Sequence, residues 1–143
     1  MTEELTAAAS ELRFVFFRLT RNLRRVRAMD ELSDAQLAAL GALRKLGRRT
    51  LSRLAEHECV TAPTMSATVN GLAELGLVVR VPDEDDRRRV YVEITPEGEK
   101  VVRDTIRSRD EALAAMIAKA GLGEKELATL HDAAVALRKV IDS

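Results

Sequence analysis

The sequence predicts a mainly α-helical fold with one small β-hairpin, in which a compact helical lobe ends in the hairpin and long helices flank it. Three observations predict this fold. Apolar residues recur at helical spacing over most of the chain. In the middle, short helices with N-cap signals follow one another closely. Behind them, two alternating apolar runs enclose a dense charge cluster at residues 83–89, as in a hairpin.

Length and composition favour a globular protein. The chain has 143 residues, a length that is enough for one domain or two tightly joined lobes. Of these residues 46% are hydrophobic and 32% are charged, as in a globular protein. No apolar run reaches the ~20 residues that a membrane span needs. The first residues lack the basic start and apolar core of a signal peptide. We therefore expect a cytoplasmic protein with no membrane partner.

The charge is balanced overall but unevenly placed. The formal net charge is zero, which argues against nucleic-acid binding when taken alone. Arginines nevertheless gather in residues 13–27 and 44–53, while the chain from Glu93 onward is more acidic. The local electrostatic field steers a ligand more than the net charge of the whole protein does, so a basic surface is still expected.

Long amphipathic helices are predicted at both ends of the chain. Leu5, Leu12, Leu19 and Val26 recur every seven residues and predict a helix over 3–28. Similar patterns predict a helix over 96–118 and, after a break at Gly121 and Gly123, a last helix that carries Leu127, Leu130, Ala134, Leu137 and Ile141. Their apolar stripes exceed what a small lobe covers, so a twofold dimer is expected. The expected division is 1–30 and 99–143 for dimerisation and 31–98 for the lobe between them.

The middle of the chain predicts a helix-turn-helix. Ser33 and Gln36 form a capping box for a helix that ends at Gly47. Arg48-Arg49-Thr50 is a connector or short strand, and Thr50 caps a brief helix to His57. After a turn at residues 58–60, Thr61 caps a helix over 62–75 whose first turn holds Pro63.

The helix over 62–75 has an unusual outer face. Met65, Val69 and Leu72 fall together and are expected to face inward. The opposite side is small and hydrogen-bonding: Pro63, Thr64, Ser66, Ala67, Asn70, Gly71 and Glu74. Such a face can enter a DNA groove, with Asn70 pairing with adenine and Thr61, Thr64 and Ser66 holding phosphates. The alternative is a surface helix with an unusually small face.

The hairpin tip carries three successive arginines. We expect Arg88 to enter the minor groove, with Asp86 orienting an arginine. Three further arginines would suit phosphates: Arg80, Arg87 and Arg89. The alternative is a self-neutralising turn that keeps the edge strands soluble.

Together these residues resemble a known family. The segments that carry the resemblance are Leu51–Ala55, Val60–Ser66, Leu72, Gly76–Val78, Arg80, Asp86–Arg88 and Val92–Gly98. They resemble the MarR (multiple antibiotic resistance regulator) family over essentially the whole chain. The resemblance implies a homodimeric winged helix-turn-helix transcription regulator, more often a repressor, that binds double-stranded DNA at a palindromic operator. It places the helix over 62–75 in the major groove and Arg88 of the wing in the minor groove. It also implies a small aromatic or anionic inducer, for which the sequence assigns no binding residues.

Other functions are weaker interpretations. Peroxide sensors of this family carry a cysteine in the first helix, whereas Cys59 lies in the turn between two helices and is expected to pack as an inert small residue. His57, Glu58, Cys59 and His131 lack zinc-ligand spacing, so neither a metal nor another cofactor is expected. No catalytic set is recognisable, which argues against an enzyme. The remaining alternative is a winged-helix module that binds protein without sequence-specific DNA binding.

Overall fold

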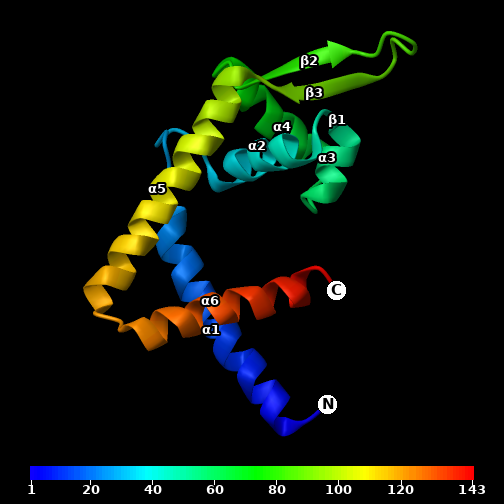
Figure 1. The fold of residues 1–143 in the computed structure, drawn as a ribbon. Coiled ribbons are helices and arrows are strands. Elements are labelled where there is room, and N and C mark those ends of the chain that lie inside the picture. Colours follow the sequence, from blue (N-terminus) through cyan, green and yellow to red (C-terminus); the bar gives the residue numbers. More distant parts are fainter. The chain divides into compact units, whose positions relative to one another are not determined.

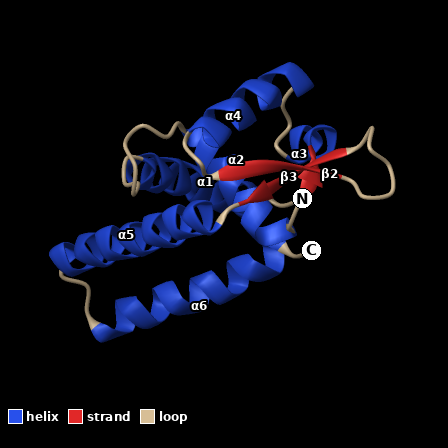
Figure 2. Ribbon diagram, turned by 90° about the horizontal axis from the view of Figure 1, so that it is seen from above, coloured by secondary structure: helices blue, strands red, loops and turns tan.

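The computed structural model describes residues 1–143 and confirms a mainly α fold with a small β-wing (Figures 1 and 2). The elements follow the order α1 (Glu3–Arg24), α2 (Asp34–Leu46), β1 (Arg49–Thr50), α3 (Leu51–His57), α4 (Ala62–Glu74), β2 (Val78–Pro82), β3 (Val90–Ile94), α5 (Pro96–Ala120) and α6 (Glu124–Ile141). The chain forms two compact units. Residues 1–109 hold α1, the helical lobe, the sheet and the start of α5, and residues 110–143 hold the rest of α5 and α6.

The core of the first unit lies between α2, α3, α4 and the sheet. It is built from aliphatic side chains, and its fully buried members include Leu40, Leu43, Leu54, Val78 and Val92. Helix α4 contributes Met65, Val69 and Leu72, which confirms the predicted inward face. Because one face of α4 packs on the core, its opposite face is turned outward.

The predicted helix caps are confirmed. Ser33 and Gln36 form a reciprocal capping box, and the hydroxyls of Thr50 and Thr61 accept backbone N–H groups three residues ahead. The turn between α3 and α4 passes through Cys59 at φ 55, a left-handed conformation that favours glycine. The Cys59 side chain is exposed, so the expectation that it packs in this turn was wrong.

The sheet is antiparallel with strand order β1-β3-β2. Strands β2 and β3 form the predicted hairpin, in register from Val78 opposite Ile94 to Pro82 opposite Val90. The short strand β1 pairs Arg49 with Val92, so the connector is a strand. The hairpin projects beyond α2, α3 and α4 as a wing (Figure 1).

Helix α1 ends at Arg24, four residues before the predicted end. Contacts with α5 replace the missing helical hydrogen bonds. The Val26 carbonyl accepts from Arg109 Nε at 2.8 Å, and the Ala28 N–H donates to the hydroxyl of buried Thr105 at 3.0 Å. The heptad pattern runs on to Val26, but these tertiary bonds stabilise a different backbone path. Helix α5 extends to Ala120, slightly beyond its predicted end.

A compact junction fixes the base of the wing to α5. The Thr95 hydroxyl donates to the Gly76 carbonyl at 2.8 Å and accepts from the Gly98 N–H at 3.1 Å. The Thr95 N–H donates to the Leu77 carbonyl at 3.0 Å. A Cβ on buried Gly98 would lie 2.2 Å from the Leu77 oxygen, so only glycine allows this approach.

We predict that Gly98→Ala destabilises the protein by about 1–3 kcal/mol, because the added methyl overlaps the backbone of Leu77. Urea-induced unfolding measures the change. Gly41→Ala is the matched control, since nothing lies within 4 Å of its Cβ in helix α2. There the same substitution should stabilise by about 1 kcal/mol through helix propensity. Equal effects at the two positions would contradict a close junction at Gly98.

Candidate nucleic-acid interface

The outer face of α4 is exposed and small. Thr61, Pro63, Thr64, Ala67 and Asn70 are exposed, and Ser66 is half-buried. The Thr61 hydroxyl caps the helix by accepting from the Thr64 N–H at 3.3 Å, and it lies 2.9 Å from the Thr64 hydroxyl. The Thr61 hydroxyl is therefore less available to another molecule than the sequence suggests.

Gly71 does not belong to this outer face. A Cβ at this position would lie 2.5 Å from the side-chain nitrogen of Gln36. The glycine thus lets α4 approach the capped N-terminus of α2, which is a packing role. Helical spacing alone predicted that Gly71 faces outward, because spacing within α4 does not show where α2 lies.

One hydrogen bond links α4 to the wing. Arg80 Nη2 in β2 donates to Asn70 Oδ1 at 2.5 Å, and both residues are exposed. Arg80 was expected on phosphates, yet in this structure its guanidinium lies against the side chain that was expected to read a base. The two residues are ten positions apart and come from different elements.

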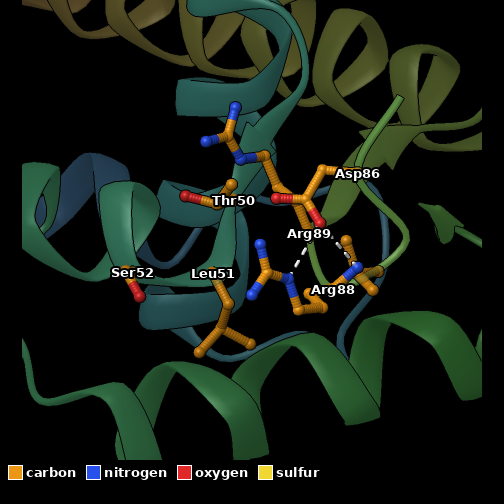
Figure 3. Close-up of a pocket in the computed structure, with 7 residues that line it drawn as sticks. Thr50, Leu51, Ser52, Asp86, Arg88 and Arg89 are labelled. Atoms are coloured by element: carbon orange, nitrogen blue, oxygen red, sulfur yellow. Dashed lines mark hydrogen bonds and ion pairs between the residues drawn. The ribbon is translucent and has the colours of Figure 1, made fainter. Parts of the chain in front are cut away.

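Asp86 holds Arg88 at the wing tip. Its Oδ1 accepts from the Arg88 backbone N–H at 3.1 Å and from Arg88 Nε at 3.2 Å (Figure 3). The Arg88 side chain is nevertheless 93% exposed. Its two terminal nitrogens are not engaged by Asp86, so they can donate to another molecule.

Asp83 organises the rest of the tip. Its carboxylate accepts from the Asp85 N–H at 3.0 Å and from the Tyr91 hydroxyl at 3.3 Å, and it lies 3.9 Å from Arg89. The guanidinium of Arg48 stacks on the Tyr91 ring, 4.4 Å from its centroid. The hydrogen bond from the Asp85 backbone N–H, helped by Tyr91 and Arg89, lowers the pKa of the Asp83 carboxyl below its ordinary 3.8, although partial burial opposes this.

A hollow of about 540 Å³ separates the wing tip from the start of α3. Asp86, Arg88 and Arg89 line it from the wing, and Thr50, Leu51 and Ser52 line it from the lobe (Figure 3). Sequence reasoning missed Ser52 and the ordering role of Asp83. A signal existed for Asp83, because an aspartate two residues before its hydrogen-bond donor is typical of an Asx turn.

A second hollow, of about 500 Å³, lies among α1, α2, the start of α4 and α5. Arg24, Asp34 and Arg109 supply charge, and Leu37 and Met65 supply apolar surface. Arg27 stabilises the side of this hollow formed by Arg24 and Asp34, because its guanidinium donates to Asp34 at 2.6 Å and to the Leu32 and Arg24 carbonyls. Burial, and then the charge of Arg27, lowers the pKa of Arg109.

The structure shows no cluster of metal ligands. His57 lies 3.1 Å from Glu58, but no three histidine, cysteine or acidic side chains gather around one point. None of the helices is both long and apolar enough to cross a membrane.

A helix-turn-helix that ends in a β-hairpin wing defines a winged helix-turn-helix protein. Residues 31–89 match the model of the MarR family. An HTH-type transcriptional regulator of Mycobacterium tuberculosis is 34% identical over 134 residues, which cover 94% of this chain and 92% of that protein. The chain belongs to the MarR family and is a DNA-binding HTH-type transcriptional regulator.

Solved structures agree with this assignment. A protein of Pseudomonas aeruginosa PA01 assigned as a transcriptional regulator is 31% identical, with a TM-score of 0.86 over 100% of this chain and 99% of that one. A MarR family protein of Bacillus stearothermophilus shares the fold at 22% identity, with a TM-score of 0.81 over 100% and 99% of the two chains.

We predict that the titration midpoint of Asp83 lies below the ordinary carboxyl value of 3.8, because the Asp85 N–H, Tyr91 and Arg89 lower its folded-state pKa. Its contribution to wing stability should be present above the unfolded pKa and be lost as the pH falls through the folded pKa. Tyr91 is the single tyrosine and there is no tryptophan, so tyrosine fluorescence reports this site. Asp83→Asn should abolish the acid transition of the fluorescence. A midpoint at or above 3.8 would contradict the hydrogen-bonded carboxylate.

Proposed function

We propose that this regulator is a dimeric repressor that binds a palindromic operator, with α4 in the major groove and the wing in the adjacent minor groove. One observation carries the proposal: the small polar face of α4 and the arginine-bearing wing lie in one compact unit, joined by the Arg80–Asn70 hydrogen bond. A nearby gene is its proposed target.

The outward face of α4 suits a DNA groove. Pro63 and Ala67 add little bulk, so the helix backbone can sink toward the base edges. Asn70 is exposed beyond them and can donate to a base. The hydroxyls of Thr64 and Ser66, near the start of the helix, would contact phosphates.

The wing supplies the cations. Arg88 is exposed and oriented by Asp86, and a guanidinium is attracted by the negative potential of a narrow minor groove. Arg87 and Arg89 suit flanking phosphates. The hollow between the wing tip and α3 would accept one backbone phosphate beside Ser52.

Unpaired apolar faces support a homodimer. Neither the 22-residue α1 nor the 18-residue α6 has a buried residue. Large apolar side chains remain exposed along both: Leu5, Leu12, Phe14, Val15, Phe16 and Phe17 in α1, and Leu127, Leu130, Val135, Val140 and Ile141 in α6. A second copy can cover these stripes with twofold symmetry, which would set two half-sites about 10 bp apart.

Two neighbours of the same fold support DNA binding and its control by a ligand. A point mutant of Staphylococcus aureus MepR, with a TM-score of 0.70, is known bound to an oligodeoxyribonucleotide. DNA binding by Bordetella bronchiseptica BpsR, with a TM-score of 0.62, is regulated by 6-hydroxynicotinic acid. In this chain, the hollow between Arg24, Arg109 and Met65 would suit a small anionic aromatic inducer.

We expect Arg88→Ala to weaken binding to the DNA upstream of the protein's own gene by about tenfold or more, because it removes the minor-groove cation. Fluorescence anisotropy over a range of salt concentrations measures the loss. Arg103→Ala, which removes an equal charge from the exposed side of α5, is the control and should bind as the wild type does. Both variants should sediment as dimers.

The salt series also tests the rival function. A DNA-binding protein loses affinity steeply with salt as counterions compete for the phosphates. A winged-helix module that binds only protein would show no such binding. Unchanged affinity in Arg88→Ala would remove the wing tip from the mechanism.

Asn70→Ala should reduce the preference for the operator over random DNA by about tenfold, while binding to random DNA stays nearly unchanged, because one base contact is lost and no phosphate contact is. Competition between the two DNAs measures the ratio. Equal losses on both would show that Asn70 does not read a base.

A further inference from the structure

A side chain of the wing takes one of the two lone pairs of the amide oxygen of Asn70, the residue proposed to read a base. Arg80 Nη2 donates to Asn70 Oδ1 at 2.5 Å. Arginine carries only donors, so the amide atom that faces it must be the oxygen, and the orientation of the Asn70 amide is fixed. No other hydrogen bond to the Asn70 side chain is present, so its Nδ2 is free to donate.

The strand register explains why Arg80 reaches α4. Side chains alternate along β2, so Arg80 lies on the same face as buried Val78 and opposite buried Val92. This face packs on the helical lobe. The Leu77 N–H donates to the Leu72 carbonyl at 3.0 Å, which ties the start of β2 to the end of α4 and fixes the separation of the two elements that carry Arg80 and Asn70.

The contact changes what Asn70 can recognise. An asparagine alone reads adenine by accepting from N6 with its oxygen and donating to N7 with its nitrogen. Here the oxygen is turned toward a guanidinium. The pair therefore presents an array of donors: the Nδ2 protons of Asn70 and the remaining N–H groups of Arg80. Guanine offers two adjacent acceptors, O6 and N7, to such an array.

We infer that Arg80 is a specificity-determining residue that positions Asn70, so that the pair reads guanine in each half-site where Asn70 alone would read adenine. This inference rests on the proposed placement of α4 in the major groove. It replaces the expectation that Arg80 only contacts a phosphate and that Asn70 pairs with adenine.

Selection from randomised double-stranded DNA tests the inference. The wild type, Asn70→Ala, Arg80→Ala and the double variant are each selected and sequenced. The position read by Asn70 is the one whose preference Asn70→Ala removes. At that position the wild type should select guanine, and Arg80→Ala should shift the preference toward adenine by about tenfold, the size of one bidentate contact. The double variant should show no preference there.

Arg87→Ala is the matched control, because it removes the same charge from the wing at a residue without a bond to Asn70. It should weaken binding evenly across sequences. If Arg80→Ala did the same, or if the wild type selected adenine at this position, the inference would be overturned and the proposed function would stand. If the wild type enriched no sequence and bound without salt dependence, the proposed function would fail together with the inference.

Discussion

The packing of one face of α4 on the core is the constraint on which the rest of the structure depends. Met65, Val69 and Leu72 bury that face in the core, and this burial holds the helix while leaving its opposite side open. A wider apolar stripe would have buried the small polar side chains that a groove requires. The chain then turns at Gly76 into β2, so the wing starts directly from the end of α4.

The acidic residues of the wing tip hold its arginines in a defined arrangement. Asp83 organises the turn through the Asp85 N–H and Tyr91, and Asp86 holds Arg88 through two hydrogen bonds. These carboxylates order the arginines without covering the guanidinium of Arg88. The tip thus gains a defined shape, which lowers the entropy that would be lost on binding. The net charge does not reveal this arrangement, because acidic and basic residues only a few positions apart cancel in the sum.

Local signals in the sequence predicted most of the fold. Caps at Ser33, Thr50 and Thr61, and the alternation on both sides of residues 83–89, are encoded within a few residues. Features that depend on tertiary contacts were not predicted. Helix α1 ends early because Arg109 and Thr105 bind the backbone after it, and Gly71 faces Gln36 instead of solvent. The Arg80–Asn70 bond joins two residues that were each singled out, but their contact depends on how the sheet lies against α4.

A crystal structure of the dimer with an operator selected from its own upstream DNA tests the central claim most directly. Our account predicts α4 in the major groove with Asn70 at a base edge, and Arg88 in the minor groove of the same half-site. A complex in which α4 lies outside the groove, or in which the wing points away from the duplex, would contradict it.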